Sequence, residues 1–350
     1  MEEKRFIIPF FISHLGCPHH CIYCDQGVIA RPVAATPPTA PEIVAEVERY
    51  LRLGRLKNRA GCQVQVAFYG GTFTALPGEI QEGLLHAVGP FLKEGVVHSL
   101  RISTRPDTLS AACLEVLAAN HVATVELGVQ SMTDEVLRRS LRGYGSEQAR
   151  EAVRNVLHSG LETGVQLMVG LPGESAETFA ETVEEVIRLR PHFVRLYPTI
   201  VIRGTELEQW FRCGDYRPLT LEEAVAISKE ALKRFRAAAI PVIRIGLQPT
   251  PTLPASIVAG PYHPAFRQLV EGALLYEQAV ALLAAHKGSQ GIPTTFVVAP
   301  QDISTFYGEG RANITRLCEA FDLREIRVRP DPLQGRGTLA LSGDGMVMAR

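Results

Sequence analysis

The chain has 350 residues, of which 46% are hydrophobic and 21% are charged, and its formal net charge is −1. This composition is ordinary for a soluble globular protein and supplies enough apolar side chains for a large core. The near-neutral charge gives no sign of nucleic-acid or membrane binding. No apolar run reaches the roughly 18 residues that a membrane-spanning helix needs.

Short apolar runs alternate with helical patterns through the first two thirds of the chain. The expected strands cover residues 6–13, 64–69, 99–103, 124–130, 164–170, 193–199 and 242–245. The expected helices cover residues 41–53, 77–93, 110–119, 134–160 with a break at 143–145, 176–189 and 221–238. Because such alternation favours parallel strands joined by crossover helices, the sequence predicts an α/β fold, an open (β/α)6 partial TIM barrel.

Two segments depart from this pattern. Residues 204–217 indicate a loop excursion, and the proline-rich residues 249–264 look irregular. Later patterns predict a small C-terminal α+β extension, with helices at 266–285 and 314–321 and strands at 295–299, 326–328, 338–341 and 346–348. We therefore expect two domains, a barrel at residues 1–250 and the extension at residues 251–350.

Three of the seven cysteines lie close together. Cys17, Cys21 and Cys24 form a C-x3-C-x2-C triplet after the first expected strand. An odd, clustered count argues against a secreted disulfide framework. The N-terminal residues lack the apolar core of a signal peptide, so we expect a cytoplasmic protein whose thiols stay reduced. The scattered cysteines fit small buried apolar residues; they are Cys62, Cys113, Cys213 and Cys318.

The triplet suits an iron–sulfur cluster. Three thiolates can hold three irons of a [4Fe–4S] cube, whose full protein ligand set is four cysteines. The fourth iron then stays open to the amino and carboxylate groups of S-adenosylmethionine (SAM). A zinc site is the alternative, because thiolates also select zinc and His14, His19 or His20 offers a fourth ligand. Zinc sites usually carry two separate ligand pairs, whereas this chain has one tight triplet.

Glycine and polar motifs follow the expected strands, where a barrel carries its reactive groups. Gly70 and Gly71, followed by Thr72, would let backbone carbonyls approach the SAM ammonium. Arg105 fits either a ligand carboxylate or a structural bond to Asp107.

The next strand ends repeat this pattern. Gln130 ends the fourth strand, and a glutamine that points into a barrel needs a polar partner such as a ligand. Arg142 fits either the SAM carboxylate or solvent. Gly170 and Pro172 belong to the turn after the fifth strand, where the chain has to pass close to the adenosine.

These pieces together resemble the radical SAM superfamily, in the branch of the elongator catalytic subunit and its short bacterial relatives. The matching runs lie within residues 5–250, and they are FYGGTFTALP, STRPD, VELGVQS, LRGY, LMVGLPGE, RLYPTIVIRGTELE and IRIGLQ. The run GPYHPAFRQLV extends the likeness. The elongator subunit has a longer gap between its first two cluster cysteines, and it carries an acetyltransferase domain for which too few residues remain here. Gly335-Arg336-Gly337 is not followed by a helix pattern that would receive a CoA pyrophosphate, so we expect no acetyl-CoA site.

The resemblance implies an enzyme that cleaves SAM reductively to a 5′-deoxyadenosyl radical, with electrons from an external donor such as flavodoxin or ferredoxin. It implies that Cys17, Cys21 and Cys24 hold the cluster. The implied SAM contacts are Gly70, Gly71 and Thr72 for the methionyl amine, Gln130, Ser131 and Arg142 for the ribose or carboxylate, and Tyr23 and the turn at residues 170–173 for the adenine.

The resemblance also favours tRNA as the substrate. Basic runs suit phosphate contacts, although most charge runs are solvated faces. A small or tetrapyrrole-like molecule, a lipid or a peptide is the alternative substrate, and a non-catalytic cluster- or zinc-binding RNA adaptor is the alternative class. The basic runs are Arg52, Arg55, Lys57 and Arg59, then Arg138, Arg139 and Arg142, then Arg324, Arg327, Arg329 and Arg336.

Overall fold

The chain divides into two compact units. The computed structural model describes residues 5–12, 15–25, 28, 36–53, 62–250, 252–285, 294–343 and 346–348. One unit comprises Met1–Leu219 and Phe235–Pro261, and the other comprises Thr220–Arg234 and Tyr262–Arg350. The domain boundary expected at residue 250 stays a prediction.

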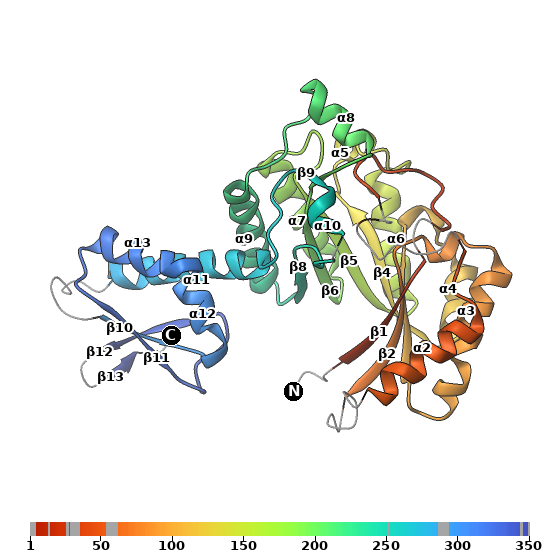
Figure 1. Cartoon of the computed structure of the whole chain (residues 1–350), viewed down its shortest axis with the longest axis horizontal. Helices are drawn as coiled ribbons and strands as arrows, with labels where there is room; N and C mark the ends of the chain where they lie inside the picture. Colours follow the sequence, from red (N-terminus) through yellow and green to blue (C-terminus); the bar gives the residue numbers. More distant parts are fainter. Residues whose placement is uncertain are drawn as a thin grey trace. The chain divides into compact units, whose positions relative to one another are not determined.

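Seven parallel strands form the sheet of the first unit (Figure 1). The strands follow one another in chain order, β1-β2-β3-β4-β5-β6-β8, and β7 belongs to a separate sheet. They are β1 (Arg5–Phe11), β2 (Gln63–Tyr69), β3 (Ser99–Thr104), β4 (Val122–Gln130), β5 (Glu162–Val169), β6 (Phe193–Pro198) and β8 (Val242–Ile245). The open (β/α)6 barrel is confirmed, and β8 follows the sixth unit as a further strand.

Side-chain contacts between distant strands show that this sheet is curled. Arg5 on β1 reaches Glu162 on β5 at 2.5 Å. Arg195 on β6 donates to the Tyr69 hydroxyl on β2 at 3.3 Å. Three strands separate the partners in each pair, so these side chains can meet only on the concave, inner face of a partial barrel.

Helices connect the strands and pack outside the sheet (Figure 1). Helix starts follow local chemistry: the Thr39 amide donates to the Glu42 carboxylate at 2.7 Å, and the Ser175 hydroxyl accepts from the Thr178 amide at 3.2 Å. The helices of this unit are α2 (Ala40–Arg52), α3 (Gly78–Lys93), α4 (Ala111–Ala119), α5 (Asp134–Arg139), α6 (Ser146–His158) and α7 (Ala176–Leu189), with single turns η1 (Phe73–Ala75) and η2 (Pro106–Thr108). Most of α9 (Leu221–Ala237), the helix between β6 and β8, belongs to the second unit.

The segment expected to be a loop at residues 204–217 contains a helix, so that prediction was wrong in part. The helix α8 (Glu206–Cys213) begins at Thr205, whose hydroxyl accepts from the Glu208 amide, and ends at Gly214 in a left-handed conformation. Its apolar side chains alternate with charges at helical spacing, which is the signal that the sequence offered. The preceding β7 (Val201–Ile202) pairs with β9 (Ile257–Ala259) after the short α10 (Leu253–Ser256).

The second unit contains the helices and strands expected of an α+β extension, together with most of α9. Its sheet has the order β11-β10-β12-β13, and its core gathers apolar side chains such as Phe296, Phe306 and Leu317. Gly335 and Gly337 precede a strand, as the sequence suggested, and not a helix. The elements are α11 (Phe266–Ala285), β10 (Thr294–Val298), η3 (Pro300–Asp302), α12 (Ile303–Tyr307), η4 (Glu309–Arg311), α13 (Ala312–Phe321), β11 (Ile326–Pro330), β12 (Leu339–Gly343) and β13 (Met346–Met348). Among the described helices of both units, none is long and apolar enough to cross a membrane.

Candidate cluster and SAM site

The cysteine loop follows β1 at the carboxyl edge of the barrel strands. A tight turn joins two of its cysteines, because the Cys24 amide donates to the Cys21 carbonyl at 3.0 Å. Ile22 and Tyr23, between them, are buried in a core cluster with residues of β5 and α8. The Leu207 amide of α8 also donates to the Ile22 carbonyl at 2.8 Å. The helix that the sequence reading missed therefore anchors the loop.

The glycine motif after β2 is bonded to the same loop. The Thr72 amide donates to the Leu15 carbonyl at 2.9 Å, and the Thr72 hydroxyl lies 3.3 Å from the Cys17 sulfur. A side chain at Gly71 would overlap the carbonyl oxygens of Ile12 and Leu15. Gly71 is therefore needed for close packing of two loops, a role additional to the predicted SAM contact.

Two arginines approach the middle cysteine. Arg142 is buried, and its Nη1 lies 3.0 Å from the Cys21 sulfur. Nη1 of Arg105 lies 3.7 Å from the same sulfur. Arg105 also forms a two-point ion pair with Asp107 at 2.9 and 2.8 Å, the structural bond that the sequence left open. Arg142 is not solvated, and its other donors bond the hydroxyls of Tyr23 and Tyr144 and the Gly128 carbonyl.

The thiols of the cysteine loop are free and are candidate metal ligands. Burial raises the pKa of both Cys17 and Cys24, so their thiolates need a metal or another positive charge. No three His, Cys, Asp or Glu side chains of the described residues gather as ligands of one ion. His14 lies outside the described residues, and the side chain of His19 packs against Gly143.

Three consecutive strands end in buried oxygens that lack a hydrogen-bond partner within the described residues. They are Gln130 Oε1 after β4, Glu174 Oε1 after β5 and Thr199 Oγ1 after β6. Gln130 also has a φ of 71°, a conformation that is costly for a non-glycine residue and that clusters at functional sites. Buried polar atoms are rarely left unsatisfied, so this edge suits a polar ligand such as SAM.

Other predicted contacts already have partners in the protein. The Ser131 hydroxyl lies 3.3 Å from that of Thr182, and both are buried. The Gly170 amide donates to the Glu174 carboxylate at 2.8 Å, while the Gly170 carbonyl accepts from Tyr216 at 2.7 Å. Pro172 is buried in the turn that follows. The predicted roles of Ser131, Gly170 and Pro172 in binding SAM stay predictions.

Sequence reasoning missed a charged cluster on the inner face of the barrel. Glu126 bonds Arg101 at 2.5 Å and Arg195 at 2.9 Å. The hydroxyls of Tyr69 and Tyr197 accept from Arg195, each at 3.3 Å. The sequence contained a signal for this cluster, because polar residues occupy every second position of strands whose other residues are apolar.

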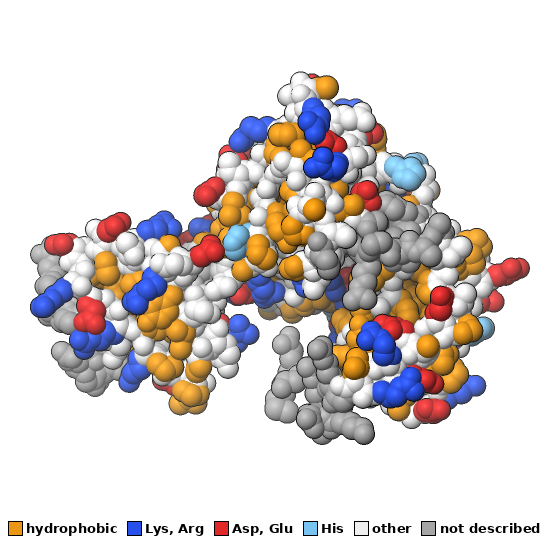
Figure 2. All heavy atoms as spheres, viewed as in Figure 1, with side chains coloured by type: hydrophobic (Ala, Val, Ile, Leu, Met, Phe, Trp, Pro, Cys, Tyr) orange, Lys and Arg blue, Asp and Glu red, His pale blue; other side chains and the backbone are white. Residues whose placement is uncertain are grey.

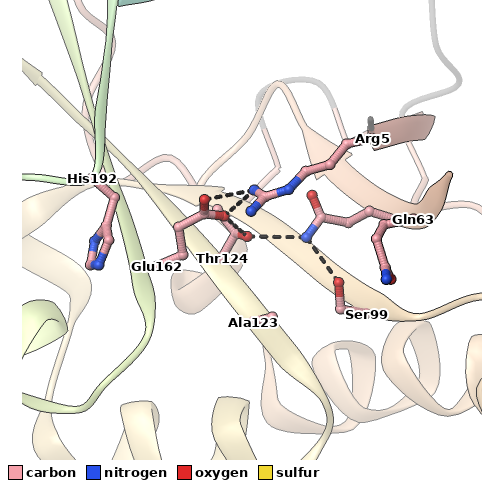
Figure 3. Close-up of a pocket in the computed structure, with 8 residues that line it drawn as sticks. Arg5, Gln63, Ser99, Ala123, Thr124, Glu162 and His192 are labelled. Atoms are coloured by element: carbon pink, nitrogen blue, oxygen red, sulfur yellow. Dashed lines mark hydrogen bonds and ion pairs between the residues drawn. The ribbon is translucent and has the colours of Figure 1, made fainter. Parts of the chain in front are cut away.

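A pocket of about 360 Å³ lies at the opposite, amino-terminal edge of the same strands. Figure 3 shows Arg5 and Glu162 pointing toward each other there, with Thr124 bonded to the same carboxylate. Gln65 bonds Ser99 and Thr124, each at 3.0 Å. These side chains form hydrogen bonds with one another, so we interpret this edge as a structural polar layer that closes the amino-terminal end of the barrel.

Among the described residues of the expected basic runs, most arginines pair with acids. Arg142 is buried and cannot be part of a surface run. Arg138 and Arg139 both pair with Glu135. On the face shown in Figure 2, basic and acidic side chains are interspersed. In the second unit Arg327 pairs with Glu325 and Arg336 with Asp302. Arg55, Lys57 and Arg59 lie outside the described residues.

The chain belongs to the radical SAM superfamily, whose model matches residues 11–186, and a radical SAM C-terminal domain model matches residues 191–275. It is therefore a radical SAM enzyme, of a class that uses a [4Fe–4S] cluster and SAM. An uncharacterized protein of Methanocaldococcus jannaschii is 30% identical to it over 67% of this chain and 73% of that protein.

Relatives with assigned names belong to the elongator branch. A tRNA uridine(34) acetyltransferase of Methanocaldococcus infernus is 28% identical over 65% of this chain and 52% of its own length. Elongator complex protein 3 of Mus musculus is 30% identical over 60% of this chain and 46% of its own length. The chain thus spans about half the length of these relatives. The solved structure of archaeal Elp3 from Methanocaldococcus infernus shares the fold, with a TM-score of 0.61, 24% identity, and coverage of 79% of this chain and 64% of that one.

Proposed function

We propose that Cys17, Cys21 and Cys24 bind a [4Fe–4S] cluster at which this enzyme cleaves SAM reductively. The main support is that the glycine motif and the cysteine loop are hydrogen-bonded to each other. The Thr72 amide donates to the Leu15 carbonyl, and the Thr72 hydroxyl lies beside the Cys17 sulfur. The cysteine loop follows β1 at the carboxyl edge of the strands, and the same edge carries the oxygens of Gln130, Glu174 and Thr199 that lack a partner among the described residues.

When bound, the cluster and SAM supply the electron transfer and the 5′-deoxyadenosyl radical. The protein's residues hold and orient both groups. Tyr23 and Ile22 exclude water from one side of the loop, since both are buried. The unpartnered polar atoms at the strand ends would accept or donate hydrogen bonds to the amino acid and ribose of SAM. We place the enzyme in the cytoplasm, with an external donor such as flavodoxin or ferredoxin supplying the electron.

We propose tRNA as the substrate. The support is the likeness to proteins named tRNA uridine(34) acetyltransferase and Elongator complex protein 3. A base would have to be splayed out to reach the SAM methylene, because radical abstraction needs direct contact. A small polar molecule is the second candidate, and the cluster of Glu126, Arg195 and Tyr197 on the inner face favours it.

Anaerobic purification tests the first part. We expect about four irons and four sulfides per chain, and methionine plus 5′-deoxyadenosine after reduction with dithionite. Cys21→Ser should lose the cluster, whereas Cys113→Ser, at a half-buried cysteine on α4, should keep it. Stoichiometric zinc without visible absorbance would contradict the proposal.

Mass spectrometry of tRNA nucleosides from a deletion strain tests the substrate.

A further inference from the structure

The three thiols of the cysteine loop have different surroundings. Cys21 faces two guanidinium groups, from Arg142 at 3.0 Å and Arg105 at 3.7 Å. Cys17 faces the neutral Thr72 hydroxyl at 3.3 Å. The Cys24 sulfur has no side-chain hydrogen bond within the described residues. Among the described residues, direct contacts with guanidinium groups are therefore made by one thiol of the three.

Arg142 lacks an acidic partner among the described residues, although it is only 4% exposed. Its partners besides Cys21 are two tyrosine hydroxyls and one carbonyl oxygen, all neutral. A buried cation without an anion is costly. As a ligand of the proposed cluster, the Cys21 sulfur would carry negative charge, and it lies 3.0 Å from Nη1 of Arg142.

Arg105 supports the same arrangement. Its charge is balanced by Asp107, and its Nη2 donates to the backbone carbonyl of Arg142. Its guanidinium and that of Arg142 both lie over the Tyr144 ring, at 5.3 and 5.1 Å from the centroid. The two arginines are thus held against each other and against Cys21.

We propose that Arg142 is the counter-ion of the cluster at its Cys21 corner, with Arg105 in a supporting position, and that together they raise the reduction potential of the cluster. Hydrogen bonds and charge at cluster sulfurs are among the main determinants of that potential. This role rests on the proposed cluster, and it competes with the SAM-carboxylate contact that the sequence suggested for Arg142. The two arginines would raise the reduction potential of the cluster whether or not SAM is bound.

The test is a redox titration of the anaerobically reconstituted protein without SAM, followed by electron paramagnetic resonance. A hydrogen bond to a charged group is worth about 1.5–3 kcal/mol. Arg142→Gln should therefore make cluster reduction at least about tenfold less favourable, a shift of about 59 mV to lower potential. Arg142→Lys keeps the charge and should restore most of the difference, and Arg105→Gln should shift the potential less, in the same direction.

Arg138→Gln is the matched control, because Arg138 lies on neighbouring α5 with its side chain 71% exposed and paired with Glu135. Its potential should equal that of the wild type. An unchanged potential in Arg142→Gln, with weaker SAM binding, would overturn the inference and assign the arginine to the SAM carboxylate. If Arg142→Gln does not fold, the sign of the shift in Arg105→Gln decides. A wild-type protein that binds no cluster would instead refute the proposed function itself.

Discussion

At the scale of single residues, Glu174 combines an enclosed carboxyl with few compensating bonds. Burial raises its pKa to about 8, and bonds from the amides of Gly170 and Leu171 and from Ser131 offset only part of this. Its Oε1 has no partner among the described residues. The carboxyl is therefore mostly protonated near neutral pH, when it can donate a hydrogen bond as well as accept one.

This raised pKa predicts a pH-dependent stability. An acid whose pKa is higher in the folded state favours folding below its unfolded pKa, and this contribution is lost as the pH rises through the folded value. Between pH of about 4.5 and 8, wild type should lose on the order of 1 kcal/mol per pH unit relative to Glu174→Gln. Urea unfolding at several pH values measures the difference. Exposed Glu181→Gln on α7 is the control, and a pH-independent difference for Glu174→Gln would refute the assignment.

Gly71 lies too close to the cysteine loop to accept a side chain. A methyl group there would overlap the carbonyl oxygens of Ile12 and Leu15, which are backbone atoms and cannot rotate away. Gly71→Ala should displace the cysteine loop and lower the iron bound per chain several-fold, and Gly71→Val should lower it further. Gly83→Ala, in α3 with open space around it, should keep the iron and slightly stabilise the helix. Equal iron contents in the two alanine variants would contradict this role of Gly71.

At the scale of elements, α8 connects the cysteine loop to the barrel. Leu207 is fully buried, and its amide bonds the Ile22 carbonyl. Leu207→Ala should cost about 2–5 kcal/mol of folding free energy and should also speed the loss of cluster absorbance in air. Leu317→Ala, fully buried in the second unit, creates a comparable cavity remote in sequence from the loop. Its cluster should decay at the wild-type rate, and equally fast decay in both variants would show that α8 has no special role.

The elements that the sequence predicted well are those with strong local patterns. Alternation of apolar strands and amphipathic helices gave the barrel, and glycine and polar motifs marked the strand ends that carry the candidate site. The helix α8 was not predicted because it is short. Its few apolar residues at helical spacing were a weaker signal than the nearby turn-forming residues Pro198 and Gly204. The partners of Arg142 and the inner-face pair of Glu126 and Arg195 depend on sheet curvature, which no local window contains.

At the scale of the whole molecule, charge and length bear on the substrate. The net charge is −1, and the described arginines of two expected basic runs are largely paired with acids or buried. Long-range attraction of a polyanion therefore has to come from a few local groups. The chain also spans about half the length of relatives named tRNA uridine(34) acetyltransferase, and the likeness to them is the support for tRNA as the proposed substrate.

Binding of tRNA should depend on contacts between basic side chains and phosphates. If tRNA is the substrate, its affinity should fall steeply with salt, because each phosphate contact releases counterions. Pooled alanine substitutions of Arg55, Lys57 and Arg59 should weaken binding and reduce the salt slope. Pooled substitutions of Arg49, Arg188 and Lys233, which pair with glutamates and lie outside the expected basic runs, should change both little. Gel shifts over a salt series measure the affinity, and tRNA should also stimulate 5′-deoxyadenosine formation by the reduced enzyme. Salt-insensitive binding together with unstimulated SAM cleavage would exclude tRNA and favour a small polar substrate at Glu126 and Arg195.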